Sequence, residues 1–295
     1  MRCVIYTVIA GDYDNLLPPA VVERGVEYVA ITGSADPAPP MPWLRRPLLR
    51  TERNSRMTSR WHKLHPHILF PEHDISLYLD GNVYLKDGIR VFIEDTSRVS
   101  PIALFRHAER ACTYEEAEVV KRYRLDDPDI VDAQMTYYRM LGFPAKLGLF
   151  TSSIQLRRHR DLALVAFLED WWRHLKAFSH RDQLSLNFML RRHGIEPVVI
   201  PGTADRNDWF ATGPHKRHAT QRESNNLVGA YDEVDWLRRS LIISAKNGTT
   251  DRHVVAKELS WHAMELLRTA KRHFNRLTWR PPKSDNPRSG GIRRS

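Results

Sequence analysis

Short apolar runs rich in β-branched residues alternate with helix-like segments through the first two hundred residues, and this alternation constrains the fold most. The clearest run covers residues 3–9, and the turn formers Ala10, Gly11 and Asp12 follow it. Further strands are expected at 26–31, 75–80, 101–105, 150–156 and 196–200, and helices at 51–64, 113–123, 128–141, 161–178 and 182–190. This order favours an α/β fold with a mixed, mainly parallel sheet flanked by helices.

The composition excludes several classes of protein. Apolar residues make up 42% of the chain, which excludes a protein disordered throughout. Only two cysteines occur, Cys3 and Cys112, so a disulfide scaffold and a cysteine-rich zinc module are excluded as well. We expect no secretory leader, because residues 1–10 show neither a charged n-region nor a small-residue cleavage site, and no membrane span, because no apolar run reaches about 18 residues. We therefore expect a soluble cytoplasmic protein with reduced thiols.

The net charge of +10 is concentrated at the C-terminal end of the chain. Residues 266–295 hold nine Lys or Arg against one acid, Asp285, and the rest of the chain is near neutral. A nucleic-acid-binding domain carries its charge on the folded body, so no nucleic-acid partner is expected. We divide the chain into a main α/β domain at 1–245, a basic amphipathic helix at 246–280 and a disordered basic tail at 281–295. This end is either solvated or in peripheral contact with an anionic membrane at its inner face.

Two loops at the ends of predicted strands hold candidate binding residues. Gly11-Asp12-Tyr13 follows the first strand, and Asp80-Gly81-Asn82 follows the strand at 75–80. In open α/β sheets, ligands bind beyond the carboxyl ends of the strands, where such loops meet. The oxygens of Asp80 and Asn82 suit Mg²⁺ or Mn²⁺ holding a diphosphate, and Gly81 allows close approach of the backbone. The alternative is a simple turn, because all three residue types favour turns.

A basic helix precedes the second of these strands. Arg53, Arg56, Arg60 and Lys63 are three or four residues apart, so they project from one face of the predicted helix. Several cations directed at one point would stabilise a departing diphosphate. A solvated basic face is the alternative interpretation.

These segments, in this order, resemble a glycosyltransferase-like family that was first catalogued as a domain of unknown function. That family occurs in bacterial polysaccharide loci and in plant Golgi proteins. The similar blocks are residues 8–14, 53–67, 76–82, 105–107 with 112–117, and 181–183. The resemblance spans residues 3–200 and implies a GT-A-like, Rossmann-like fold, a nucleotide-sugar donor and a divalent metal, Mn²⁺ or Mg²⁺, at an Asp-x-Asp-type motif. Asn82 here replaces the second carboxylate of that motif.

The resemblance also implies roles for individual residues. Its implied donor-binding residues are Gly11, Asp12, Tyr13, Arg53, Arg56, Lys63, Asp80, Gly81, Asn82 and His107. Its implied metal ligands are Asp80, Asn82 and His215, the last from a late segment similar to one that closes on the donor phosphates. Asp182, Gln183 and Glu115 are the implied catalytic residues, with Glu115, Glu116 and His107 toward the acceptor.

Some of these residues have a plainer explanation. Thr113-Tyr114-Glu115-Glu116 predicts a capping box at the start of a helix, so Glu115 could serve only there. Asp182 could likewise only cap the helix at 182–190.

The sequence therefore predicts a glycosyltransferase that moves a sugar, with UDP-sugar the expected donor, to a hydroxyl of a glycan in surface polysaccharide assembly. If the reaction inverts configuration, Glu115 or Asp182 would be the general base, and if it retains configuration, Asp182 or Gln183 would position the sugar. A noncatalytic scaffold that binds polyanions or membranes through the basic tail is the alternative. A nucleotidyltransferase is disfavoured. It would need a glycine-rich phosphate-binding loop after the first strand, and Gly11 is the single glycine there.

Overall fold

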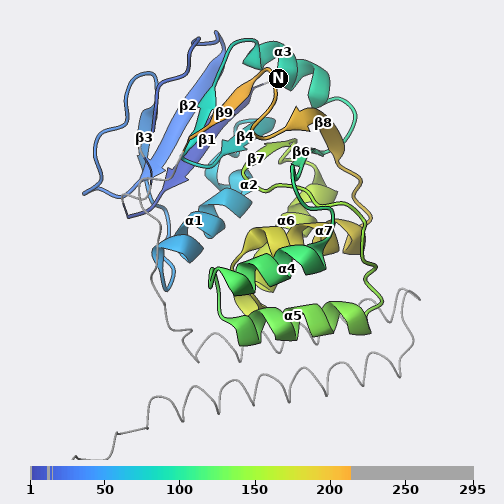
Figure 1. The fold of residues 1–295 in the computed structure, drawn as a ribbon. Coiled ribbons are helices and arrows are strands. Elements are labelled where there is room, and N and C mark those ends of the chain that lie inside the picture. Colours follow the sequence, from blue (N-terminus) through green and yellow to red (C-terminus); the bar gives the residue numbers. More distant parts are fainter. Residues whose placement is uncertain (1, 12–13, 15, 214–295) are drawn as a thin grey trace, which may run out of the picture. The chain divides into compact units, whose positions relative to one another are not determined.

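A computed structural model describes residues 2–11, 14 and 16–213 (Figure 1). The predictions for Asp12, Tyr13 and His215, and for the segments 246–280 and 281–295, fall outside these residues.

The described residues form a seven-stranded sheet in the order β3-β2-β1-β4-β7-β6-β8. These strands are β1 (Cys3–Ile9), β2 (Val26–Thr32), β3 (Leu44–Pro47), β4 (Ile75–Leu79), β6 (Ile102–Arg106), β7 (Ile154–Arg157) and β8 (Val198–Thr203). Only β7 runs antiparallel to its neighbours, β4 and β6, while the other pairs are parallel. The predicted α/β fold class, with a mixed and mainly parallel sheet flanked by helices, is confirmed. A second sheet pairs β5 (Val83–Leu85) with β9 (Phe210–Thr212).

Helices cover both faces of the main sheet (Figure 1). They are α1 (Ser55–Leu64), α2 (Pro66–Leu69), α3 (Ile89–Thr96), α4 (Thr113–Arg122), α5 (Pro128–Met140), α6 (Leu162–Ala177) and α7 (Asp182–Arg192). On one face, Ile5 and Leu77 join a core with Phe92 of α3. On the other, Tyr6 and Tyr78 pack around Phe70, and α1 packs on β1 and α6. Because both faces are buried, β1 is a continuous apolar run rather than an alternating one.

The register of the central strands brings two loops together. β1 and β4 are parallel neighbours with Cys3 opposite Ile75 and Thr7 opposite Leu79, so both chains leave the sheet at the same end. A Cβ added to Gly81 would lie 2.8 Å from Cβ of Asp14, which shows that the loop after β4 touches the loop after β1. The glycine is thus needed for close approach of these loops. The two loops that the sequence singled out meet as predicted.

Several predicted boundaries were wrong. The helix expected from 51 begins at Ser55, because the side chain of Asn54 accepts a hydrogen bond from the Met57 amide and caps it there. The capping box at Thr113 does not form, since the cap residue of α4 is Cys112 and no side chain caps it. The elements β3, α2, α3, β5 and β9 were not predicted; β3, α2, β5 and β9 have only three or four residues, too few to show a period.

Candidate functional site

The carboxyl end of β4 presents Asp80 from a fixed turn. The Asp80 amide donates to the Ser153 carbonyl at 2.8 Å, and the Asp80 carbonyl accepts from the Val83 amide at 3.0 Å. These bonds tie the residue to the start of β7 and to β5. The Asp80 side chain keeps 25% of its surface exposed, so its carboxylate is held by the protein and still open to a ligand.

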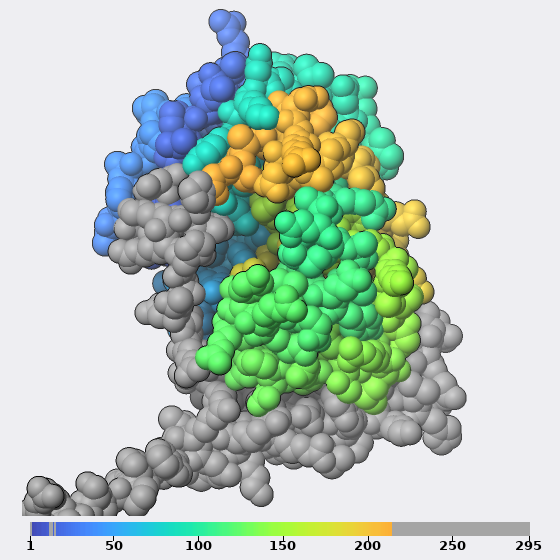
Figure 2. Space-filling model, in the orientation of Figure 1, coloured from blue at the N-terminus to red at the C-terminus, as the bar shows by residue number. Residues whose placement is uncertain are grey.

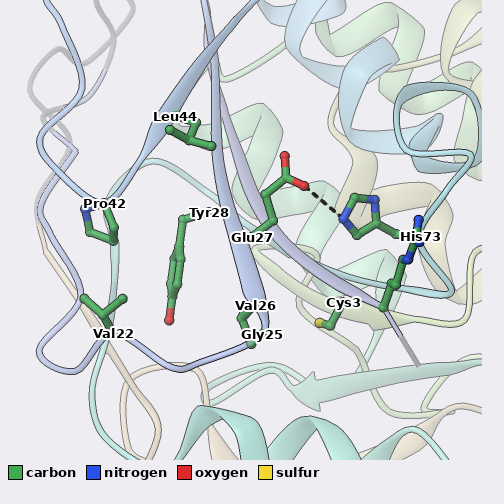
Figure 3. Close-up of a pocket in the computed structure, with 10 residues that line it drawn as sticks. Cys3, Val22, Gly25, Val26, Glu27, Tyr28, Pro42, Leu44 and His73 are labelled. Carbon is green, nitrogen blue, oxygen red and sulfur yellow. Dashed lines mark ion pairs between the residues drawn. The ribbon is translucent and has the colours of Figure 1, made fainter.

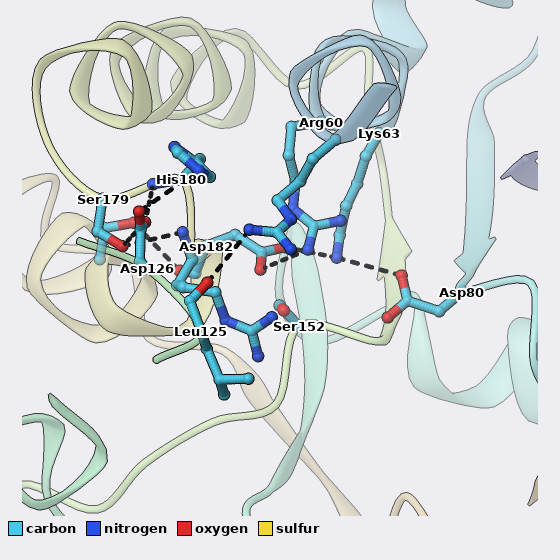
Figure 4. Close-up of polar contacts among 12 residues, drawn as sticks. Arg60, Lys63, Asp80, Leu125, Asp126, Ser152, Ser179, His180 and Asp182 are labelled. Atoms are coloured by element: carbon cyan, nitrogen blue, oxygen red, sulfur yellow. Dashed lines mark hydrogen bonds and ion pairs between the residues drawn. The ribbon is translucent and has the colours of Figure 1, made fainter. Parts of the chain in front are cut away.

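A buried lysine joins Asp80 to the first residue of α7 (Figure 4). The Nζ atom of Lys63 lies 2.6 Å from Oδ2 of Asp182 and 3.5 Å from Oδ1 of Asp80, and its side chain is fully buried. Arg60, one turn earlier on α1, lies 3.2 Å from Oδ1 of Asp182. The hydroxyl of Tyr78 donates to Oδ1 of Asp80 at 2.7 Å. We call Arg60, Lys63, Tyr78, Asp80 and Asp182 the charge cluster.

Burial and charge act in opposite directions on the titration of this cluster. Burial raises the pKa of Asp182, but the positive charges of Arg60 and Lys63 outweigh it and hold that pKa well below its ordinary value. Burial lowers the pKa of Lys63, and the charges of Asp182 and Asp80 offset only part of this effect. Asp182 is therefore an ionised carboxylate across the physiological range.

Two of the plainer explanations can now be judged. The cap residue of α7 is Arg181, and the carboxylate of Asp182 contacts Lys63 and Arg60, so Asp182 is not a helix cap. The basic face of α1 is not simply solvated, because its cations become more buried along the helix. Arg56 is half-buried, Arg60 is 15% exposed and Lys63 is completely buried. Arg53 is exposed and precedes the cap residue Asn54, so it does not lie on the helix face that the sequence predicted for it.

A second buried group beside the cluster was missed by sequence analysis. Asp126, in the loop between α4 and α5, accepts hydrogen bonds from the Ser179 hydroxyl and from the His180 amide at 3.1 Å. Burial lowers the pKa of His180 to about 4, and the charges of Arg56 and other arginines add to this effect against the opposing Asp126. Arg56 also donates to the Leu125 carbonyl at 3.2 Å. These contacts hold the loop after α4 against α1 and the start of α7.

Asn82 is bonded to the last described strand. Its Nδ2 donates to the Gly213 carbonyl at 2.7 Å, and the Gly213 amide donates to the Asn82 carbonyl at 2.9 Å. With Nδ2 committed, Oδ1 is the Asn82 atom suited to a cation, alongside the carboxylate of Asp80. Within the described residues no three His, Cys, Asp or Glu side chains are grouped to hold a metal. The metal prediction stays a prediction.

Of the remaining predicted residues, His107 and Glu115 lie outside the charge cluster, and Gln183 is next to Asp182 in the sequence. His107 accepts from the amides of Glu109 and Arg110, both at 3.1 Å, and so closes a turn after β6. Glu115 is exposed on the first turn of α4, and Glu116 is buried against Arg110. Gln183 follows Asp182 on α7 and is half-buried. No hydrogen bond or ion pair among the described residues joins His107 or Glu115 to the charge cluster.

Gly11, in the loop after β1, lies close to the start of α1. It adopts a φ of +79°, which favours glycine, and a Cβ there would lie 3.6 Å from Cβ of Ser55 at the start of α1. The loop after β1 therefore approaches the amino end of the basic helix. Figure 2 shows the surface hollowed between the green residues around α4 and the blue residues of the early chain.

No curated protein matches the sequence. The apo crystal structure of mouse xyloside xylosyltransferase 1 is similar with a TM-score of 0.40 and 11% identity, over 66% of this chain and 84% of that one. The TOD1/MUCI70, glycosyltransferase-like domain matches residues 50–199, half of the chain, and this range includes the whole charge cluster. The chain belongs to the TOD1/MUCI70 glycosyltransferase-like family.

Proposed function

We propose that the protein transfers a sugar from a nucleoside-diphosphate sugar, with UDP-sugar the first candidate, to a hydroxyl of a glycan acceptor in surface polysaccharide assembly. The observation that carries the proposal is the buried Lys63 ammonium between Asp80 and Asp182 at the carboxyl end of the sheet. A buried cation bridging two carboxylates is costly to desolvate, and such arrangements concentrate at functional sites. The family to which the chain belongs supports the transferase class.

The cations of α1 suit a diphosphate leaving group. As the bond from the anomeric carbon to the diphosphate breaks, negative charge grows on the phosphate oxygens, and fixed positive groups stabilise it. Arg53 is exposed just before the amino end of α1, and Arg60 on the helix is held by Asp182. Because these groups are oriented before the reaction, little reorganisation is needed in the transition state.

Asp182 is better suited to positioning than to proton transfer. An efficient general base has a pKa near the working pH, whereas two neighbouring cations hold the pKa of Asp182 far below it. A stable negative charge beside the donor sugar would instead favour the positive charge that develops at the anomeric carbon. Of the two roles expected for Asp182, we therefore infer the second, in which it orients and stabilises the reacting sugar.

A divalent ion is part of this proposal. Asp80 and Asn82 would contribute two oxygens to Mg²⁺ or Mn²⁺, and Mg²⁺ in such sites commonly takes one or two carboxylates and completes its shell with water and substrate phosphates. When bound, the ion would neutralise charge on the diphosphate. Removal of the ion with a chelator should then lower donor turnover, and addition of Mn²⁺ or Mg²⁺ should restore it.

The experiment is a donor screen with a matched pair of variants. Uridine, guanosine and cytidine diphosphate sugars are offered with Mn²⁺, with Mg²⁺ and with a chelator, and release of the nucleoside diphosphate is measured. Asp80→Asn should lower turnover by about 100-fold or more, the effect of losing one oriented charged group. We choose asparagine because the buried Tyr78 hydroxyl keeps an acceptor, so the melting temperature should change little.

Asp74→Asn is the control, since Asp74 lies just before the same strand, at the opposite end, and pairs with Arg160 at 3.3 Å in an exposed position. It should keep full turnover. No turnover of any donor by the wild type, or equal turnover by the two variants, would contradict the proposal.

A second function rests on the charge at the end of the chain, where residues 266–295 carry eight net positive charges. We propose that this segment binds an anionic membrane surface, since each Lys or Arg adds about 1 kcal/mol near such a surface. No helix in the described part of the chain is long and apolar enough to cross a membrane. Binding to acidic liposomes that weakens steeply with salt would support this proposal, and equal binding to neutral liposomes would contradict it.

A further inference from the structure

Arg157, the last residue of β7, is a fully buried cation without a buried anion beside it. Its guanidinium donates to the Lys63 carbonyl at 2.7 Å, to the Tyr6 hydroxyl at 2.6 Å and to the Gln155 side-chain carbonyl at 3.2 Å. None of its partners among the described residues is a carboxylate. Burial of a charged group that only neutral oxygens compensate is unfavourable for folding, so the arrangement calls for another explanation.

Arg157 lies next to the charge cluster, because its guanidinium packs against the rings of Tyr6 and Tyr78. The guanidinium carbon lies 5.7 Å from the ring centre of Tyr6 and 5.8 Å from that of Tyr78, whose hydroxyl donates to Asp80. The Tyr6 hydroxyl itself donates to the Lys63 carbonyl at 2.8 Å. Burial raises the pKa of Tyr6 to about 12 against the opposing charge of Arg157, so this hydroxyl stays protonated and able to donate.

Two side chains donate hydrogen bonds to the Lys63 carbonyl and so fix the carboxyl end of α1. Lys63 is the penultimate residue of α1, and the last carbonyls of a helix have no partner within it. They also carry the negative end of the helix dipole, which a cation stabilises. Arg157 and Tyr6 both bond this carbonyl, and therefore hold the backbone of the residue whose ammonium joins Asp80 to Asp182.

Arg157 also reaches the loop that holds Asp80. Gln155 accepts from Arg157 and donates through Nε2 to the Ser152 carbonyl at 2.9 Å. The adjacent Ser153 carbonyl accepts the Asp80 amide. One buried side chain thus connects the backbone of Lys63 with the backbone that supports Asp80.

We propose that Arg157 is a positioning residue of the donor site, which fixes the last turn of α1 so that the Lys63 ammonium lies between Asp80 and Asp182. The proposal rests on the proposed function for its catalytic consequence, but not for its structural content. It assigns Arg157 no contact with the substrate. Its charge and its fork of donors are both required, because the two terminal nitrogens of the planar guanidinium reach separate acceptors that one compact ammonium nitrogen does not span.

The first test measures the accessibility of Lys63 in the full chain, without any donor. Reductive methylation of lysine amines, followed by mass spectrometry of the peptides, gives the labelling rate of Lys63 relative to Lys86. Arg157→Met should raise the relative rate of Lys63 about tenfold, because the last turn of α1 then opens more often. Tyr6→Phe removes one of the two bonds to the same carbonyl and should give a smaller rise, so it tests the proposal if Arg157→Met does not fold.

His159→Leu is the matched control. His159 is also completely buried, and its Nε2 donates at 3.0 Å to the Phe70 carbonyl at the end of α2. The variant should be destabilised similarly but should leave the labelling of Lys63 unchanged. If Arg157→Met and Tyr6→Phe label Lys63 no faster than this control does, or if Lys86 rises in parallel, the proposal is wrong.

The second test measures donor turnover in the same variants. Arg157→Met and Arg157→Lys should both lower kcat at least tenfold with a smaller change in KM, since a misplaced lysine weakens the transition state more than substrate binding. His159→Leu should keep kcat. Absence of turnover in the wild type contradicts the proposed function and leaves the labelling result to decide the positioning role. Full kcat in Arg157→Met contradicts the positioning role.

Discussion

Charged side chains lie at both ends of the parallel strands, and their surroundings differ. At the carboxyl end, Lys63 and Asp182 are almost completely buried and contact each other at 2.6 Å. At the amino end, Glu27 pairs with Arg46 at 2.7 Å and with His73 at 3.1 Å (Figure 3), but Glu27 keeps 31% of its side chain exposed. The second group is partly solvated, whereas the first depends more on its own members for stabilisation.

The amino end also holds a cavity of about 440 Å³, lined by residues that include Cys3, Val22, Tyr28 and Leu44. Its volume lies in the range of ligand sites. The polar groups favour the carboxyl end instead. Glu27 and His73 beside the cavity are paired with each other and partly solvated, whereas the charged groups at the carboxyl end converge where α/β folds bind ligands. The comparison leads us to base the candidate site on buried, mutually compensated charge rather than on empty volume.

The largest expected effect comes from Lys63→Met. The substitution keeps the volume of the side chain but leaves Asp182 buried with one cation fewer, and breaking a buried ion pair in this way costs about 3–5 kcal/mol. Unfolding in urea, followed by circular dichroism, measures the change. Lys86→Met is the control, since half-buried Lys86 donates to the neutral Asn207 carbonyl and its loss should cost only about 1 kcal/mol. Equal losses of unfolding free energy in the two variants would show that the buried ion pair of Lys63 stabilises the fold no more than the neutral hydrogen bond of Lys86.

A smaller and pH-dependent effect is expected for Asp182→Asn. The folded protein holds the pKa of Asp182 below its unfolded value of about 3.9, so the unfolded state binds the proton first as the pH falls. The stability contributed by the charge is therefore complete above about pH 5 and is lost progressively below about pH 4.

Asp182→Asn should be less stable than the wild type by about 1.5–3 kcal/mol at neutral pH, the range for hydrogen bonds to charged groups. The difference should shrink as the pH is lowered toward 2 in urea titrations. A difference that stays constant over this range would show that the charge of Asp182 contributes nothing to folding.

The smallest effect is expected at the amino end, for Glu27→Gln. Exposed ion pairs contribute roughly 0–1 kcal/mol, so the free energy of unfolding should change by less than about 1 kcal/mol. Added salt should reduce even this change, because screening acts on exposed charges. Donor turnover should be unaffected. A loss of unfolding free energy as large as that of Lys63→Met would show that the difference in solvent exposure does not determine how much the charges at each end contribute to stability.

Much of the fold is predictable because the residues that form it act locally. The strands β1, β2, β4, β6 and β8 are apolar, β-branched runs, and each was placed to within a few residues. The helices α4 to α7 follow their apolar spacing, and the side chains of Asp127 and Asp161 cap α5 and α6. Cys112 shows the limit of this approach, because the better cap former Thr113 lies beside it and is buried inside the helix instead.

Part of the candidate site could also be predicted. Gly81 and Asp80 follow a buried strand, and parallel strands bring such loops to one end of the sheet. The spacing of cations on the basic helix singled out Lys63, and the resemblance to a glycosyltransferase-like family added Asp182 as a catalytic residue; the structure brings the two together. His180, Asp126 and Arg157 were missed, because no local pattern distinguishes a buried histidine, aspartate or arginine from an exposed one.

By itself, therefore, the sequence determined the α/β class, the principal strands and the loops that leave them at the carboxyl end. Only the tertiary structure decided which charges are buried and which partners they have. Lys63 and Asp182 are separated by 119 residues, and Tyr6 and Arg157 by 151. Such pairs form because helices pack on a sheet and exclude water from between them, and that exclusion of water makes each charge depend on its neighbours.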